Sequence, residues 1–168
     1  MKHKQPLLLN NSPLFKIFVA PPPQNTPCRY DNTPDFCYNA SMTQKSASTH
    51  WFRSAKETSI AAKDNFVIKH YDWSLFLWHL TIEKTLKGII AKKSMISPPS
   101  HDLEKLAKHA RISIPNTYRM ALHEITTYNI EARYDDYKRR FYKKATKTYT
   151  ARWTNICQEI YLWLIQQN

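Results

Sequence analysis

Glycine is nearly absent from this chain, whose 168 residues include a single one, Gly88. Glycine is the usual residue where a tight turn, a β-bulge or a phosphate-binding loop needs a positive φ angle. A P-loop, a dinucleotide-binding glycine fingerprint and most architectures with many β-strands are therefore excluded. The fold class that remains is all-α.

Cysteines and long apolar runs are also scarce. The three cysteines are odd in number, widely separated and form no Cys-x-x-Cys pair, so they predict no disulfide framework and favour a reducing compartment. No apolar run approaches the length of a membrane span, and the run 7–9 is too short for the core of a signal peptide. We therefore expect a cytoplasmic protein without a membrane partner.

Acidic residues are outnumbered by basic ones, with 13 Asp and Glu against 25 Lys and Arg and a net charge of +12. A positive field of this size attracts polyanions such as nucleic acid or anionic lipid. Charge alone names no partner, because many small basic proteins are simply soluble.

Seven of the ten prolines lie within the first 41 residues. Proline removes backbone donors and favours extended structure in its neighbour, so a stable helix is not expected there. We expect residues 1–48 to form an irregular, proline-rich arm and residues 49–168 to form the folded domain. Met42 is an alternative start of the native chain. The other interpretation is an extended arm that packs on the domain or on a partner.

Beyond residue 48, apolar residues recur at spacings of three and four, which predicts helices. The expected helices cover about 49–69, 73–93, 101–110, 115–130 and 138–166. Asp72 and Ser100 are expected to cap the second and the third helix. The expected core positions include Leu75, His79, Ile82 and Leu86 in the second helix and Tyr142, Ala145, Tyr149 and Trp153 in the last. Four long helices and one short helix with short connections make an up-and-down helical bundle.

Three short motifs follow one another in this helical part. The first is Glu83-Lys84-x-x-Lys87-Gly88-Ile89-Ile90 in the second helix, after the aromatic residues Phe76 and Trp78. The second is His101-Asp102-Leu103, and the third is Tyr128-x-x-x-x-Arg133-Tyr134. In this order and at this spacing they resemble the HEPN family (higher eukaryote and prokaryote nucleotide-binding domains) over about residues 50–168.

The resemblance implies a helical bundle that is often a homodimer and is frequently paired with a minimal nucleotidyltransferase in toxin–antitoxin modules. Many HEPN proteins are metal-independent ribonucleases that use an Arg-x(4–6)-His motif. Here only three residues separate Arg119 from His123, and no histidine follows Arg133 or Arg152. The histidine that would act as acid or base is therefore missing at workable spacing.

The residues expected to contact a nucleotide or RNA are Lys84, Lys87, Arg133, Tyr134, Arg139 and Arg140. Arginine offers a planar fork for phosphate, and tyrosine offers a stacking face for a base. Each also has a structural interpretation: the lysines lie on a solvated face, Arg133 pairs with a nearby carboxylate, and the basic segment 138–147 is merely solvated. Cations at the start of a helix oppose its dipole, which favours a bound anion in that segment.

The histidines and Gly88 complete the candidate residues. His79, four residues before Glu83, is expected to be a hydrogen-bonded core residue, with metal binding as the alternative. His101 is expected to orient against a carboxylate. Gly88, inside a helix, predicts a close helix–helix contact at about 1 kcal/mol of lost helix propensity.

The sequence thus predicts a protein that binds a nucleotide or RNA, without a cofactor or metal. One alternative is a variant HEPN ribonuclease that uses His101 or His123 with Arg133 or Arg119. The other alternative is a non-catalytic module for protein interaction or dimerisation.

Overall fold

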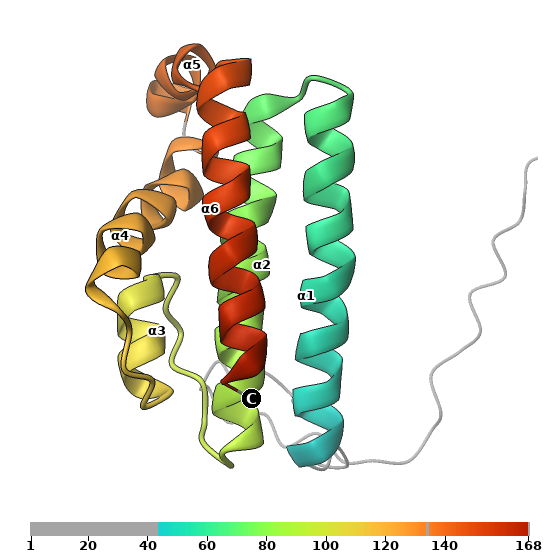
Figure 1. Cartoon of the computed structure of the whole chain (residues 1–168), viewed down its shortest axis with the longest axis vertical. Helices are drawn as coiled ribbons and strands as arrows, with labels where there is room; N and C mark the ends of the chain where they lie inside the picture. Colours follow the sequence, from blue (N-terminus) through green and yellow to red (C-terminus); the bar gives the residue numbers. More distant parts are fainter. Residues whose placement is uncertain (1–43, 134, 168) are drawn as a thin grey trace, which may run out of the picture. The chain divides into compact units, whose positions relative to one another are not determined.

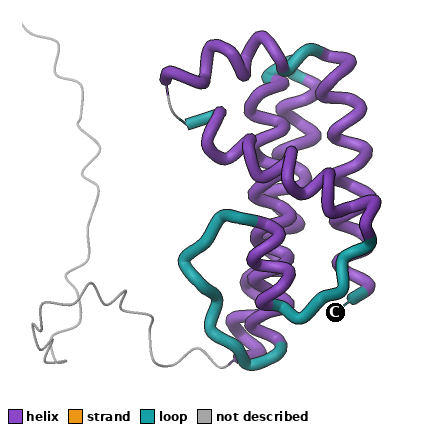
Figure 2. Tube along the Cα trace, turned by 90° about the vertical axis from the view of Figure 1, so that its left-hand side faces the viewer, coloured by secondary structure: helices purple, strands orange, loops and turns teal. Residues whose placement is uncertain are grey.

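The computed structural model describes residues 44–133 and 135–167. Within these residues the chain forms six helices and no strand, as Figure 2 shows. They are α1 (Gln44–Val67), α2 (Tyr71–Lys92), α3 (Leu103–His109), α4 (Asn116–Glu131), α5 (Asp135–Lys144) and α6 (Lys147–Gln166). The all-α bundle is confirmed, with α1, α2 and α6 side by side (Figure 1).

The second helix, α2, lies at the centre of the bundle, because each of the other five described helices contacts it. The core positions expected in it are all buried, from Leu75 to Leu86. Trp78, Thr81 and Thr85 are fully buried as well. A surface helix buries one stripe, whereas α2 is covered on several sides, so its buried residues exceed the predicted set.

Gly88 brings α1 and α2 close together. A Cβ atom at Gly88 would lie 3.0 Å from the ring of Phe52 in α1. The Ser48 hydroxyl also donates a hydrogen bond to the Gly88 carbonyl, at 3.1 Å. The close helix contact predicted at this glycine is confirmed.

Three helices end in the left-handed conformation without a glycine. The residues that follow α1, α2 and α3 are Lys69, Ser94 and Arg111, with φ angles of 67°, 60° and 54°. After each of them, the next amide donates to a carbonyl five residues back: His70 to Asn65, Met95 to Ile90 and Ile112 to Ala107. These are Schellman motifs, whose left-handed position is usually glycine. The scarcity of glycine therefore places ordinary residues at strained positions.

The single long helix predicted over about 138–166 is wrong. The helix α5 ends at Lys144 and α6 begins at Lys147. Thr146 is extended, and its hydroxyl accepts a hydrogen bond from the Tyr149 amide at 3.3 Å, so it caps α6. The break changes which side of α5 is buried: Phe141 is 1% exposed, whereas Tyr142, the predicted core residue, is 69% exposed.

Both predicted caps are also wrong. Asp72 lies inside the first turn of α2, which begins at Tyr71. The cap of α3 is Asp102, whose carboxylate accepts from the Lys105 amide at 3.0 Å, while the Ser100 hydroxyl accepts from the Asp102 amide at 3.2 Å. The helix α3 therefore begins two residues later than a Ser100 cap implies.

The start of α5 also differs from the prediction. Because α5 begins at Asp135, its lysines Lys143 and Lys144 fall in the last turn, which is the end that the helix dipole favours for cations. The dipole conflict predicted for this segment is absent from α5, and that argument for a bound anion no longer applies.

Among the described helices, none has the length and apolar character needed to cross a membrane.

Candidate functional site

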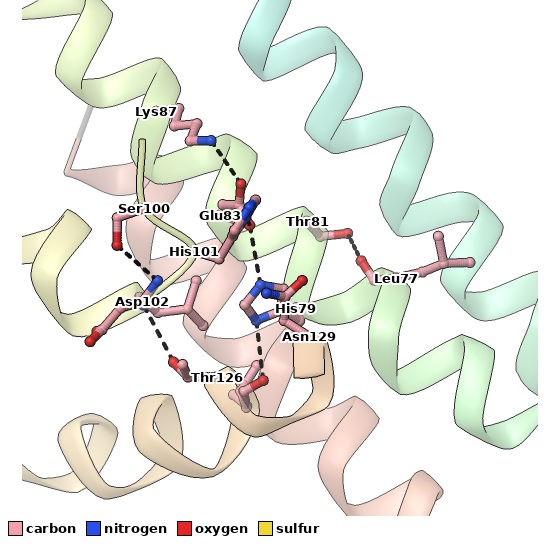
Figure 3. A network of polar contacts seen from close by, with 12 residues as sticks. Leu77, His79, Thr81, Glu83, Lys87, Ser100, His101, Asp102, Thr126 and Asn129 are labelled. Carbon is pink, nitrogen blue, oxygen red and sulfur yellow. Dashed lines mark hydrogen bonds and ion pairs between the residues drawn. The ribbon is translucent and has the colours of Figure 1, made fainter. Parts of the chain in front are cut away.

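A buried carboxylate, Glu83, is the centre of a polar network in the middle of α2 (Figure 3). His79 Nε2 and His101 Nδ1 lie 3.1 and 3.0 Å from Oε2, and Lys87 donates to Oε1 at 2.8 Å. Burial alone would raise the pKa of Glu83, but hydrogen bonds from His79, Lys87 and His101 outweigh it and lower the pKa to about 2. Glu83 is therefore a carboxylate at neutral pH.

His79 is fully buried between two hydrogen-bond acceptors. Its Nδ1 lies 3.1 Å from the carbonyl oxygen of Ile125 in α4, and its Nε2 faces the Glu83 carboxylate. Through these two contacts His79 joins α2 to α4, and the prediction of a hydrogen-bonded core histidine is confirmed.

His101 lies in the loop before α3, with its side chain 51% exposed. Its Nδ1 faces Glu83, so the predicted orientation against a carboxylate is confirmed. The described residues contain no group of three His, Cys, Asp or Glu side chains arranged to hold a metal ion.

The two lysines of the second-helix motif face different partners. Lys84 donates to the Thr58 hydroxyl of α1 at 2.7 Å. Lys87 bonds to Glu83, and its ammonium lies 5.4 Å from the centroid of the Trp51 ring. The Lys87 side chain is only 15% exposed and its charge is compensated by Glu83. In this structure both lysines tie α2 to neighbouring groups rather than meet at one ligand site.

The predicted arginines lie in another part of the molecule. Arg133 follows α4, while Arg139 and Arg140 are in α5, and all three are exposed. The Arg133 Nε donates to the Asn129 carbonyl at 2.9 Å. Figure 1 shows α5 beside the start of α6, at the end of the bundle where α1 connects to α2. Tyr134 lies outside the described residues.

The helix α5 buries one aromatic ring and exposes another. Phe141 packs on Tyr128 of α4, with 5.5 Å between the ring centroids. Tyr142 is exposed together with three cations of the same helix. We call this surface the α5 face, and it consists of Arg139, Arg140, Tyr142 and Lys143. A hollow of about 230 Å³ beside it is lined by Glu131, Arg140, Phe141 and Lys144.

Lys144, at the end of α5, pairs with two carboxylates of α4. Its ammonium lies 2.7 Å from Glu124 and 3.7 Å from Glu131. Burial alone would raise the pKa of Glu124, but hydrogen bonds from Lys144 and Tyr149 lower it. The Tyr149 hydroxyl donates to Glu124 and receives a hydrogen bond from Tyr128. This network holds the junction of α5 and α6 against α4.

A second cleft, of about 440 Å³, separates the start of α3 from α4. It is lined by Asp102, Glu104, His123, Thr126, Thr127, Ile130 and Glu131. The exposed His123 therefore faces carboxylates, which repel a phosphate. Arg119, one turn earlier, lies 3.6 Å from Glu104. His101 and His123 are in different surroundings, the first on Glu83 and the second in this acidic cleft.

The fold and the motif positions together define the class of protein. A helical bundle with the buried Glu83 motif in its central helix and a basic segment before its last helix matches the sequence model of the HEPN domain over residues 48–167. The chain belongs to the HEPN domain family.

One solved structure supports the fold independently. The crystal structure of TT1696 from Thermus thermophilus is similar with a TM-score of 0.64, at 17% sequence identity, over 72% of this chain and 98% of that one. At this identity the similarity concerns the fold alone. No curated protein matches this chain with significant similarity.

Proposed function

We propose that the protein binds RNA or a nucleotide through the α5 face, together with Arg133. The observation that carries this proposal is the concentration of exposed cations on α5, where Arg139, Arg140 and Lys143 lie within five residues. Arginine and lysine bind phosphate through charge-assisted hydrogen bonds. The second-helix lysines contribute less, since Lys84 and Lys87 are only partly exposed, whereas Arg133 and the cations of the α5 face are exposed.

We also propose a cytoplasmic setting, which the scattered cysteines and short apolar runs favour, and a homodimer with a minimal nucleotidyltransferase as a partner, which the family resemblance implies. Exposed apolar side chains offer surface for such protein contacts. Four of them lie near the connection of α1 and α2: Ile60, Val67, Ile68 and Trp73.

RNA binding should weaken steeply as salt is added. Each phosphate contact in a single strand is expected to add about −0.7 to the slope of log affinity against log salt concentration. We expect the triple variant Arg139→Gln, Arg140→Gln, Lys143→Gln to lose at least about tenfold in affinity and to reduce the slope by about 2. Fluorescence anisotropy with a labelled 20-nucleotide RNA measures both quantities.

A matched control removes the same charge elsewhere. Lys45, Lys92 and Lys108 are exposed on α1, α2 and α3, and their triple Gln variant should bind RNA within about threefold of the wild type. Equal losses in both variants would mean that only net charge matters and would contradict a site on α5. Cleavage of the RNA in this assay would favour the variant ribonuclease, and absence of binding at low salt would favour the interaction module.

A further inference from the structure

We infer that the α5 face binds single-stranded nucleic acid, with the ring of Tyr142 as a platform on which one unpaired base stacks. The inference rests on the proposed function and specifies the class of ligand that the same surface takes.

The first observation is the exposure of Tyr142. With 69% of the residue accessible, it is the most exposed aromatic residue among those described. Other tyrosines have partners: Tyr128 is fully buried, Tyr149 bonds to Glu124, and Tyr118 packs on Trp163 with ring centroids 5.4 Å apart. An aromatic ring presents a large apolar face, so an exposed ring with cations beside it on a surface helix is a candidate contact for a ligand.

The second observation is the charge around that ring. Arg139 is three residues before Tyr142 and therefore lies beside it on the helix surface, and Lys143 is the next residue in the chain. A base that stacks on Tyr142 brings its flanking phosphates within reach of these cations. Aromatic platforms with basic side chains around them are how proteins hold single strands.

The third observation is that the buried side of α5 is packed against α4. Phe141 is 1% exposed and packs on Tyr128, and Ala145 is 4% exposed. Lys144 pairs with Glu124 and Glu131, so the end of α5 is tied to α4. The backbone that carries Tyr142 is thereby fixed on its inner side, which lowers the entropy lost when a base stacks.

A duplex fits this surface less well than a single strand. In a helix of paired RNA each base face is already stacked, and the major groove is too deep and narrow for side chains to enter. The ring of Tyr142 would therefore find no open base face, and only the cations would contribute. Since every base has a π-face, stacking also predicts little sequence preference.

The test compares two RNA probes and two variants of the full chain. We expect a labelled 12-nucleotide single strand to bind the wild type at least about tenfold more tightly than a blunt duplex of 12 base pairs without a loop. Tyr142→Leu should weaken binding of the single strand about tenfold without changing binding of the duplex, while Tyr142→Phe, which keeps the ring, should stay within about threefold of the wild type. The salt slope should be the same in all three proteins, because stacking involves no counterion release.

The outcomes separate this inference from the proposed function. Equal affinity for the two probes, or wild-type affinity of Tyr142→Leu, would contradict stacking while salt-dependent binding through the cations still stood. A Tyr142→Leu variant with a changed salt slope would also contradict it, since the loss would then be ionic. No binding of either probe at low salt would overturn both. Thermal unfolding checks that the variants are folded. Substitution of an exposed side chain should leave the unfolding temperature unchanged.

Discussion

Glu83 illustrates how the meaning of one residue depends on which side chains the fold places around it. In the sequence, Glu83 stands beside lysines whose structural interpretation is a solvated helix face, yet the residue is only 4% exposed and its carboxylate binds three donors. His101 comes from a loop 18 residues away in the chain, and no spacing rule pairs it with Glu83. The pairing with His79 follows from their separation of four residues on one helix.

Glu83 should make the free energy of unfolding depend on pH in acid. Its folded pKa of about 2 lies below the ordinary value of 4.5, so the unfolded chain binds the proton first. The stabilisation is complete above about pH 4.5 and is lost as the pH falls towards 2, by about 3 kcal/mol in total. Urea unfolding at several pH values measures this loss.

The variant Glu83→Gln removes the carboxylate that the buried His79 and the partly buried Lys87 share. We expect it to lower the free energy of unfolding at pH 6 by about 3 kcal/mol and to flatten the dependence on pH between 4.5 and 2. Glu57→Gln, at an exposed position of α1, is the control and should change it by less than about 0.5 kcal/mol. The same acid slope in wild type and Glu83→Gln would contradict the assignment.

The candidate binding residues were partly predictable. The exposure of Arg139 and Arg140 follows from their charge. The separation of Lys84 and Lys87 from those arginines could not be predicted from the sequence. The two lysines contact Thr58 and Trp51 of α1, and a sequence pattern does not show which helix lies opposite.

At the scale of elements, the clearest failure of prediction is the break between α5 and α6. Spacings of three and four run across it through positions 142, 145 and 149, so the apolar pattern shows no interruption. Thr146 is tolerated inside helices and is also a good cap, and only the hydrogen bond to the Tyr149 amide shows which role it takes. On the N-terminal side of this break Phe141 is buried and Tyr142 is exposed, the reverse of what the unbroken pattern predicts.

The helix ends lead to a prediction about stability. Lys69 and Arg111 hold left-handed φ angles at the ends of α1 and α3, a conformation that costs a residue with a Cβ atom about 1 kcal/mol or more. Lys69→Gly and Arg111→Gly should therefore each raise the free energy of unfolding by about 0.5 to 1 kcal/mol. This gain remains after the greater conformational entropy that glycine loses on folding is subtracted. Urea unfolding measures the gain.

The control for these variants is a glycine placed within a helix. Lys108→Gly, inside α3, should lower the free energy of unfolding by about 1 kcal/mol. If Lys69→Gly or Arg111→Gly destabilised the protein as Lys108→Gly does, the left-handed positions would not be the source of strain.

At the scale of the whole molecule, the bundle was predictable because long periodic helices with short connections have few other ways to bury their apolar sides. The position of α2 at the centre was not. Its pattern shows one apolar stripe, and Thr81, Thr85 and Glu83 look like surface residues until helices close around them. The Thr81 hydroxyl donates to the Leu77 carbonyl, and the Thr85 hydroxyl donates to the Thr81 carbonyl. These hydrogen bonds satisfy the buried hydroxyls within α2.

The proposed homodimer should respond to salt in the opposite way to RNA binding. Two copies of a chain with a charge of +12 repel each other, and salt screens that repulsion while leaving apolar contacts in place. We expect the dimer fraction to increase between 50 and 300 mM NaCl, at roughly constant protein concentration, in sedimentation velocity experiments. A protein that stays monomeric at about 100 μM in both conditions would contradict the dimer.

Because the chain breaks before α6, α5 can unfold locally without unfolding α6. Opening α5 would expose Phe141 and separate Lys144 from its two carboxylates, while the contacts of α2 with α1 and α6 do not involve α5. The free energy of that local opening is therefore smaller than the free energy of global unfolding. A ligand that binds only the closed form shifts this equilibrium towards order, so the affinity of the α5 face and the folding of α5 are thermodynamically linked.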